Sequence, residues 1–201
     1  MNNTLTRALS GSIYIAIMWF ATSYSKTSLT ILFLIILFIC LYEMYKLRKG
    51  KTKTLAFLSI LSPFLLVHLI ATKLVLFMFI LTWTFDTFAY LVGVRFGKHK
   101  IIPTISPNKS WEGFAGGFIL TIITAYLAVN YFLEIGLTQI IAISLLVPFT
   151  ATIGDFIESY YKRESGVKDS GSLIPGHGGM LDRMDAFIIT IPVIYILTKI
   201  L

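Results

Sequence analysis

Charged residues are scarce in this chain, and cysteine is nearly absent. Asp, Glu, Lys and Arg make up 13% of the 201 residues, and hydrophobic residues make up 56%. An ordinary soluble domain has roughly 25% charged residues, so the composition argues against a soluble fold and indicates an integral membrane protein. The single cysteine, Cys40, excludes a disulfide within the chain and argues against redox chemistry.

Acidic residues are fewer than basic ones, with 10 Asp and Glu against 17 Lys and Arg. In a soluble protein a net charge of +7 would suggest a nucleic-acid partner, but here the basic residues lie at the ends of apolar segments, where they set membrane orientation. We therefore expect no nucleic-acid partner. Because no repeat, low-complexity tract or long polar linker is apparent, we interpret residues 1–201 as one membrane-embedded domain.

Long apolar intervals predict an all-α fold, a polytopic membrane bundle of about seven transmembrane helices. A spanning helix needs about 20 mostly apolar residues. The first interval could instead be a cleaved signal peptide, but its 18 uncharged residues favour a retained anchor. The last interval is the shortest in its uncharged part. The seven intervals are 8–25, 27–45, 54–72, 74–94, 113–133, 137–160 and 184–201.

The distribution of Lys and Arg predicts the orientation of these helices. With the N-terminus inside, 14 basic residues fall on the inner side of the membrane and 3 on the outer side. The positive-inside rule therefore places the N-terminus and the loops near 46–53, 95–109 and 162–183 in the cytoplasm. We expect a multi-pass protein of the inner (cell) membrane with these loops facing the cytoplasm.

The segment 159–185, SYYKRESGVKDSGSLIPGHGGMLDRMD, concentrates charge in this otherwise apolar chain. Its five glycines and Pro175 exclude a regular helix through the middle and let backbone N–H groups approach a ligand closely. Three aspartates and four Lys or Arg side chains so close together need either water or a ligand that carries metal ions and phosphates. A nucleoside triphosphate with a divalent metal meets both needs, whereas a merely solvated basic loop is the alternative interpretation.

The spacing S-x-x-K-R-x4-K-D-x-G-x-x-I-P-x-H-G-G-x-x-D-R-x-D in this segment resembles the signature of the phosphatidate cytidylyltransferases, also called CDP-diacylglycerol synthases. A second block at 106–113, SPNKSWEG, resembles the family's SPKKTxEG, with Asn108 in place of Lys and Ser110 in place of Thr. Tyr161 stands where the family prefers an aliphatic residue or Phe. The resemblance extends from about Thr82 onward, and family members are typically longer.

This resemblance implies transfer of a cytidylyl group from CTP to phosphatidate, which gives CDP-diacylglycerol and pyrophosphate for phospholipid biosynthesis. The lipid phosphate is itself the nucleophile, so the protein has to position two anions and neutralise the leaving pyrophosphate, with Mg²⁺ as the expected cofactor. Alternatives are a cytidylyltransferase for another lipid phosphate, such as an isoprenoid one, an ion-coupled transporter and a non-catalytic scaffold. A homodimer is left open as an assembly.

The resemblance also implies roles for individual residues. The expected catalytic residues are Lys168, Asp169, His177 and Arg183. The expected contacts to CTP or phosphatidate are Ser106, Lys109, Lys162, Arg163, Gly178 and Gly179. The metal candidates are Asp169, Asp182 and Asp185, with Asp155 and Asp86 in reserve on neighbouring helices.

Two intramembrane features support this set on physical grounds. Asp86 is the only charge in its predicted span, and an ionisable group inside a membrane is costly enough to indicate a function. With Tyr90 at i+4 it could line a polar pocket, although an Asp bonded to a neighbouring helix is the alternative. The spacing of Asp155, Glu158, Ser159 and Lys162 puts them on one helix face, which must look into the bundle or the active-site cavity.

The remaining polar positions have simpler expected roles. Ser110 is a plausible N-cap for the fifth helix, and Glu112 would complement the helix dipole or bind metal. The glycines at 113–117 would allow close helix packing. We expect His68 to be hydrogen-bonded or interfacial rather than a ligand, and the basic linker 46–53 to determine topology.

Overall fold

The computed structural model describes residues 3–51 and 53–201, and the side chain of Arg7, which entered the charge count, lies outside that description. No strand occurs among the described residues. The long helices are α1 (Asn3–Tyr24), α2 (Lys26–Leu47), α3 (Thr54–Leu66), α4 (Thr72–Phe96), α5 (Trp111–Ala128), α6 (Leu137–Glu164) and α8 (Phe187–Ile200). The short ones are η1 (Val67–Leu69), η2 (Val129–Tyr131), η3 (Leu133–Ile135) and α7 (Leu181–Met184). The predicted all-α membrane bundle is confirmed.

The seven long helices correspond in order to the seven predicted intervals. In the described part of the chain, four stretches are long and apolar enough to cross a membrane, namely α2, α4, α5 with η2, and α6. Helices α3 and α8 are shorter, with 13 and 14 residues. The last interval was expected to begin at 184, but α8 begins at Phe187 because a turn at 185–186 separates it from α7. The protein is therefore a multi-pass membrane protein.

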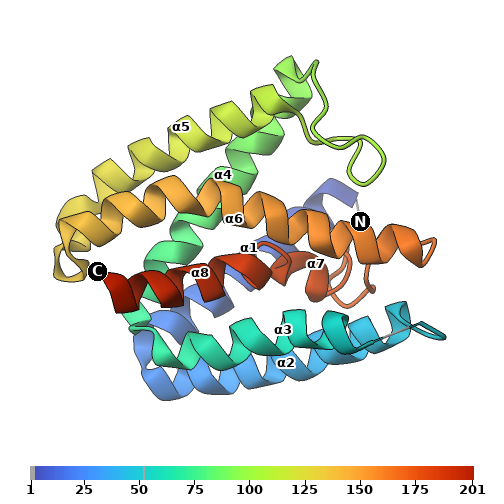
Figure 1. Cartoon of the computed structure of the whole chain (residues 1–201), viewed down its shortest axis with the longest axis horizontal. Coiled ribbons are helices and arrows are strands. Elements are labelled where there is room, and N and C mark those ends of the chain that lie inside the picture. Colours follow the sequence, from blue (N-terminus) through green and yellow to red (C-terminus); the bar gives the residue numbers. More distant parts are fainter. Residues whose placement is uncertain (1–2, 52) are drawn as a thin grey trace.

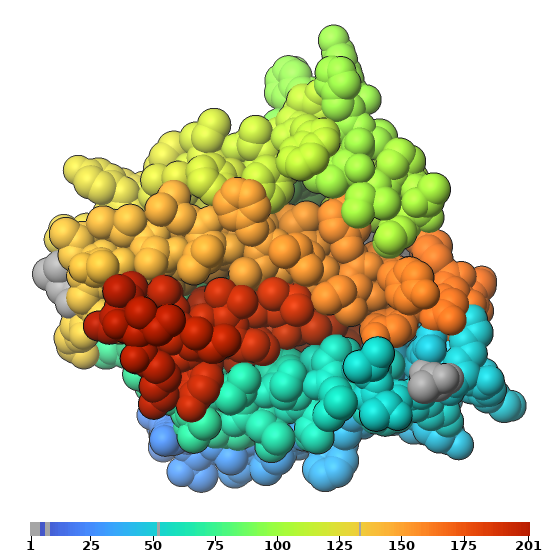
Figure 2. Space-filling model, viewed as in Figure 1, coloured from blue at the N-terminus to red at the C-terminus, as the bar shows by residue number. Residues whose placement is uncertain are grey.

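The helix connections alternate between two ends of the bundle (Figure 1). One end, which we call the motif end, holds the α2–α3 turn, the α4–α5 loop and the α6–α7 loop. Two contacts join these three connections: Arg48 is ion-paired with Glu164, and Arg163 Nε donates to the carbonyl of Ile105 at 3.3 Å. Figure 2 shows the α4–α5 loop lying against the end of α6. The three connections that were predicted to share one side therefore do so.

The opposite end of the bundle gathers the other connections. A cavity of about 570 Å³ there is lined by residues that include Lys73, Glu134 and Lys199, and Lys73 is ion-paired with Glu134 at 2.6 Å. His68 also lies toward this end, where its Nδ1 is 3.4 Å from Thr30 Oγ1. The expectation that His68 is a hydrogen-bonded residue is confirmed.

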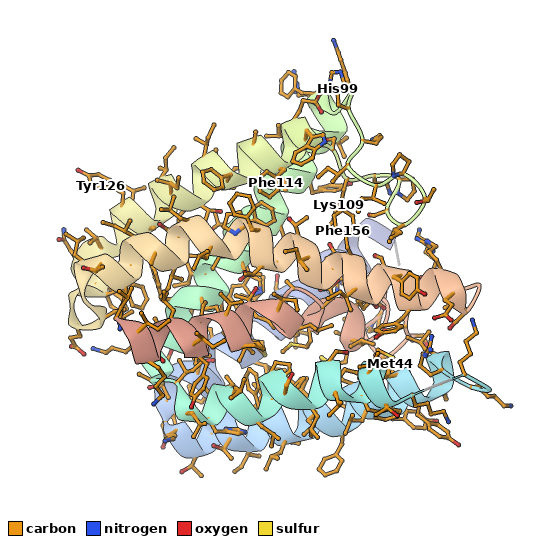
Figure 3. The ribbon with its side chains drawn as sticks, viewed as in Figure 1. Met44, His99, Lys109, Phe114, Tyr126 and Phe156 are labelled. Atoms are coloured by element: carbon orange, nitrogen blue, oxygen red, sulfur yellow. The ribbon has the colours of Figure 1, made fainter. Side chains whose placement is uncertain are left out.

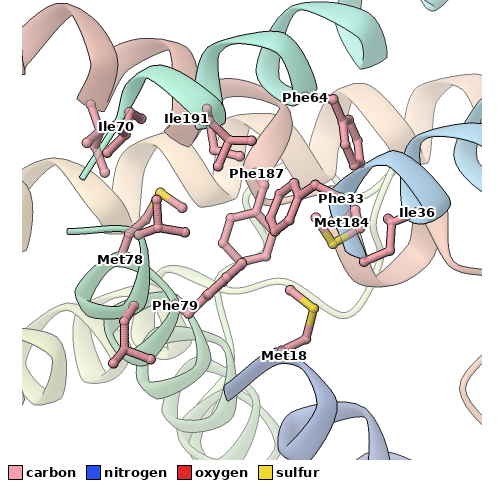
Figure 4. Close-up of a cluster of buried hydrophobic side chains, with 14 of the residues drawn as sticks. Met18, Phe33, Ile36, Phe64, Ile70, Met78, Phe79, Met184, Phe187 and Ile191 are labelled. Atoms are coloured by element: carbon pink, nitrogen blue, oxygen red, sulfur yellow. The ribbon is translucent and has the colours of Figure 1, made fainter. Parts of the chain in front are cut away.

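A cluster of buried apolar side chains joins α1, α2, α3, α4, α6 and α8 (Figure 4). At its centre the rings of Phe79 and Phe187 meet edge to face with centroids 4.7 Å apart, and Phe33 packs against Phe79 at 6.0 Å. Lipid chains are as apolar as these rings, so the cluster stabilises the bundle mainly through close packing. The interpretation of the chain as one domain stays a prediction.

Glycines set the close approach of α5 to α4. A Cβ at Gly113 would lie 2.6 Å from the Ala89 carbonyl oxygen, and a Cβ at Gly117 would lie 2.8 Å from the Phe85 ring. These glycines therefore serve helix packing, as predicted. Ser110 caps the same helix, since its Oγ accepts from the Gly113 N–H at 3.2 Å, which confirms the predicted N-cap.

Candidate active site

Three carboxylates converge about two and a half turns from the motif end of α6. Asp155 and Glu158 are one helical turn apart on that helix, and Asp185 lies in the turn between α7 and α8. One oxygen from each can be chosen so that all three lie within 4.8 Å of one another. We call Asp155, Glu158 and Asp185 the carboxylate cluster.

Gly154 allows this convergence. A Cβ at this position would run into the backbone carbonyl of Asp185 and lie 3.1 Å from that of Ala186. Both are backbone atoms, which cannot turn aside as a flexible side chain could. The absence of a side chain at residue 154 therefore brings the α7–α8 turn against α6 and places Asp185 beside Asp155.

Two lysines balance part of the negative charge. Lys109 reaches from the α4–α5 loop to form an ion pair with Asp155, and its Nζ lies 5.2 Å from the centroid of the Phe156 ring (Figure 3). Lys162, one turn beyond Glu158 on α6, places its Nζ 2.5 Å from a Glu158 oxygen. The α4–α5 loop and α6 thus each contribute a cation to one site.

The carboxylate cluster fits a divalent cation. Glu158 is fully buried, and neither of its oxygens has a hydrogen bond of suitable geometry within the described part of the chain, although Lys162 lies close. A buried carboxylate in that state is unfavourable unless further positive charge compensates it. Carboxylate oxygens are also the donors that Mg²⁺ prefers. Asp155, Glu158 and Asp185 are thus the residues that would hold the metal.

Asp182 lies outside this cluster and organises the α6–α7 loop instead. Its Oδ1 accepts from Lys162 Nζ at 2.7 Å, and its Oδ2 accepts from the N–H groups of Gly179 at 2.7 Å and Ser170 at 2.9 Å. Burial raises the pKa of Asp182, but Lys162 and these N–H groups outweigh it and hold the pKa below its usual range. The carboxylate is therefore ionised, and both of its oxygens accept hydrogen bonds from the protein. Its expected role as a metal ligand stays a prediction.

The glycines of the HGG sequence are required by this arrangement. Gly178 has a φ of 84°, and a Cβ there would lie 2.6 Å from Asp182 Oδ2. The N–H of Gly179 is already donated to Asp182. The two glycines therefore shape the loop around a carboxylate, while their expected contacts to substrate remain untested.

Helix α1 covers the same loop. The hydroxyl of Ser10 donates to the Pro175 carbonyl at 2.8 Å and lies 2.9 Å from Nδ1 of His177. Tyr14 donates to the Arg183 carbonyl at 3.4 Å. The expected catalytic residues His177 and Arg183 are thus oriented by a helix that the sequence motifs do not include. Nε of Arg183 is buried without a hydrogen bond among the described residues, so its guanidinium still has a donor to offer.

Comparison with known proteins identifies the relatives of this site. The model of the cytidylyltransferase family matches residues 68–201. The chain belongs to the cytidylyltransferase family. It is 44% identical over 125 residues to the phosphatidate cytidylyltransferase of Staphylococcus aureus (strain COL), a match that covers 61% of this chain and 48% of the relative.

Two other relatives give the same result. The phosphatidate cytidylyltransferase of Thermotoga maritima is 46% identical over 129 residues, covering 60% of this chain and 47% of that protein. The protein of that name from Haemophilus influenzae is 44% identical over 124 residues, covering 59% and 43%. The chain spans about half the length of the curated relatives it matches. The resemblance read from the two motifs is confirmed at the level of the family.

The second cytidylyltransferase motif is held mainly by backbone contacts. Glu112 accepts from the N–H groups of Lys98 and His99, at 3.1 and 3.2 Å, and is ion-paired with the His99 ring at 2.6 Å, so it closes the loop rather than joining the carboxylate cluster. The N–H of Ser106 donates to a carbonyl within the same loop. Arg163, an expected phosphate ligand, donates to the carbonyls of Ile105 and Val167.

The other predicted site residues lie farther apart. Lys168 and Asp169 are exposed at the motif end, and Asp169 lines a cavity of about 370 Å³ with lysines of the α2–α3 turn rather than the carboxylate cluster. Asp86 on α4 keeps exposed surface and interacts electrostatically with Asp155, Lys109 and Arg183. Asp86 thus borders the cluster, whereas Asp169 lies within the α6–α7 loop. The metal role of each stays a prediction.

Sequence reasoning missed two acidic residues. Glu158 was placed on the correct helix face but not among the site residues, although its spacing from Asp155 was the available signal. Glu43, near the end of α2, was treated as part of an apolar span. Its carboxylate bonds to Ser170, Met180 and Leu181, more than 120 residues away in the sequence. Nothing in the local pattern around Glu43 indicates those partners.

The geometry predicts that a methyl group at residue 154 weakens metal binding. In Gly154→Ala, α6 and the α7–α8 turn have to separate, so Asp155 and Asp185 move apart. We expect the affinity for Mn²⁺, used as a spectroscopic substitute for Mg²⁺, to fall by about tenfold or more in protein reconstituted in nanodiscs. Ile153→Ala, next to it on the lipid-exposed face, is the control with unchanged affinity. Equal affinities of wild type and Gly154→Ala would refute this account of the site.

Proposed function

We propose that the protein transfers a cytidylyl group from CTP to phosphatidate, forming CDP-diacylglycerol and pyrophosphate. The observation that carries the proposal is the carboxylate cluster with its two ion-paired lysines, Lys109 and Lys162, inside the region that the cytidylyltransferase family model matches. The names of the relatives support the choice of phosphatidate as the acceptor. The reaction joins a soluble nucleotide to a membrane lipid, which suits a site inside a helical bundle near its motif end.

In this reaction an oxygen of the phosphatidate phosphate attacks the α-phosphorus of CTP. The new P–O bond forms as the bond between the α-phosphorus and the bridging oxygen breaks, and that oxygen leaves with the pyrophosphate. No protein nucleophile is required, so the residues act by position and charge. Mg²⁺ at the carboxylate cluster would neutralise phosphate oxygens and the leaving pyrophosphate.

The cations nearest the cluster have distinct parts in this proposal. Nε of Arg183 makes no hydrogen bond to any described residue, so it can donate to a phosphate oxygen. Lys109 belongs to a loop and contacts only the edge of the cluster, so it can move to a phosphate group when the nucleotide arrives. Lys162 is buried between Glu158 and Asp182, so it fixes the loop relative to α6 and contributes a stationary positive charge.

Bound substrate would also involve the motif loops. Lys168 and His177 lie on the α6–α7 loop, Arg163 lies in the last turn of α6, and Ser106 lies on the α4–α5 loop, so both loops can approach the nucleotide from the motif end. The distribution of basic residues favours an inner-membrane protein whose motif end faces the cytoplasm. The cytoplasm is the compartment in which CTP is available. A homodimer is compatible with this proposal and is not required by it.

An assay of the purified protein tests the reaction. Protein in detergent or nanodiscs, given labelled CTP, phosphatidate and Mg²⁺, should form CDP-diacylglycerol with release of pyrophosphate, and chelation of the metal should stop it. An isoprenoid phosphate offered in place of phosphatidate should be a poor acceptor. If the isoprenoid phosphate is the better acceptor, the lipid assignment fails while cytidylyl transfer stands. If no lipid phosphate reacts, the proposed function is wrong.

Substitutions in the carboxylate cluster test which residues carry the reaction. Asp155→Asn and Asp185→Asn each remove one negative charge from the expected metal site, so we expect kcat to fall on the order of 100-fold or more. Asp182→Asn should cause a comparable loss because the loop and Lys162 lose their shared partner. His68→Ala, at the opposite end of the bundle, should stay near wild-type activity. Normal turnover in both cluster variants would remove the metal assignment.

The orientation is tested with single cysteines in a Cys40→Ser background. Lys98 and Leu173 are exposed at the motif end, whereas Lys199 lies at the opposite end. We expect an impermeant thiol reagent applied to intact cells to label Lys199→Cys at once, and Lys98→Cys and Leu173→Cys after permeabilisation. The reverse pattern would place the motif end outside the cell.

A further inference from the structure

Glu43 is a buried carboxylate on α2, outside the part of the chain that the family model matches. It lies one turn before the end of α2 at the motif end, and 5% of its surface is exposed. A charged side chain at this depth needs partners that satisfy both oxygens. The α6–α7 loop and α7 supply all of the hydrogen bonds described for it.

The Glu43 carboxylate caps α7 from another helix. Its Oε1 accepts from the N–H of Met180 at 3.0 Å, and its Oε2 accepts from the N–H of Leu181 at 2.8 Å. The first N–H groups of a helix have no partner within the helix, and Met180, the N-cap of α7, provides no side-chain bond. Glu43 therefore does for this short helix what an N-cap side chain would do.

Ser170 links Glu43 to Asp182. Its hydroxyl lies 3.0 Å from Glu43 Oε2 and 2.9 Å from Asp182 Oδ2. Because a hydroxyl has a single proton, it donates to one of these oxygens at a time. The two carboxylates thus hold the same loop, Asp182 from α7 and Glu43 from α2.

The Glu43 carboxylate lies so close to two glycines of the loop that neither position has room for a side chain. A Cβ at Gly171 would lie 2.6 Å from Glu43 Oε1, and a Cβ at Gly179 would lie 2.5 Å from Oε2. At Gly171 the Glu43 carboxylate supplies the two closest contacts, and the next atom is 3.4 Å away. The glycine at 171 is therefore explained by the approach of this carboxylate.

We propose that Glu43 is a positioning residue for the active site: it fixes the start of α7, and with it Arg183 and Asp185, relative to Asp155 and Glu158 on α6. Asp185 follows Leu181 by one helical turn, so a shift at the start of α7 passes to Asp185. The expected effect of Glu43 on kcat rests on the proposed cytidylyl transfer, whereas its effect on the start of α7 does not. Helix α2 then belongs to the active site, although its sequence lies before the matched region.

Amide hydrogen exchange of the full-length protein in nanodiscs tests the structural part without any assay of activity. Glu43→Gln keeps the size of the side chain but replaces one acceptor oxygen by an NH₂ group, which cannot accept from a backbone N–H. We expect peptides that contain Met180 and Leu181 to exchange about tenfold faster, with α4 and α5 unchanged. Unchanged exchange at these amides, or faster exchange throughout the bundle, would overturn the proposal.

Kinetics test the positioning role. We expect Glu43→Gln to lower kcat about tenfold or more, whereas Glu134→Gln, an exposed glutamate at the opposite end, should stay within about twofold of wild type. A residue that only fills space would tolerate the isosteric Gln. Wild-type kcat in Glu43→Gln therefore contradicts the inference, whereas an inactive wild type contradicts the proposed function and leaves the exchange result to decide the structural part.

A double-mutant cycle provides a second, independent measurement. Gly171→Ala should slow the wild-type enzyme because the new methyl group displaces the Glu43 carboxylate. In a Glu43→Ala background that obstruction is gone, so adding Gly171→Ala should change kcat by less than about twofold. Equal losses in the two backgrounds would show that Gly171 does not depend on Glu43 and would overturn the proposal.

Discussion

The buried Lys162 side chain, held between Glu158 and Asp182, is the interaction on which the active site depends. It joins α6 to α7 and at the same time offsets negative charge on both sides. Removing Lys162 inside a low-dielectric bundle would take this compensation from both carboxylates, and the loss of one partner of a buried ion pair costs about 3–5 kcal/mol. The α6–α7 loop can therefore be irregular and rich in glycine while α7 keeps its position against α6.

Glycines that let helix backbones approach closely bring the other parts of the site together. In a membrane the hydrophobic effect does not drive helices together, so small residues that permit contact decide which helices meet. Gly113 and Gly117 bring α5 against α4, which aims the α4–α5 loop and Lys109 at α6. Gly154 brings the α7–α8 turn against α6 and joins Asp185 to Asp155. The packing glycines and the charged residues thus form one system, in which the former set the distances at which the latter interact.

Hydropathy and charge were sufficient to predict the helices, their alternation and the gathering of the two motifs at one end. Those are local properties, since each depends on a run of about 20 residues. The inward face of α6 was predicted from spacing alone, and the structure places Asp155 and Glu158 in the cluster. What the pattern could not predict was which aspartate does what: Asp182 accepts from three donors of the loop and from Lys162, whereas Asp155 and Asp185 meet in the carboxylate cluster. This difference depends on tertiary contacts.

Glu43 shows why such contacts escape a sequence pattern. A single acid one turn inside an apolar helix reads as the polar end of a span, and its partners are two backbone N–H groups and one hydroxyl, which leave no trace in residue identity. Because Met180 provides no cap, the same α7 without α2 would begin with unpaired N–H groups beside an ionised Asp182. The matched region from residue 68 onward therefore contains the carboxylate cluster but lacks Glu43, one of the two carboxylates that hold the α6–α7 loop. An active site in this protein is a property of the whole bundle, including helices that its motifs do not mark.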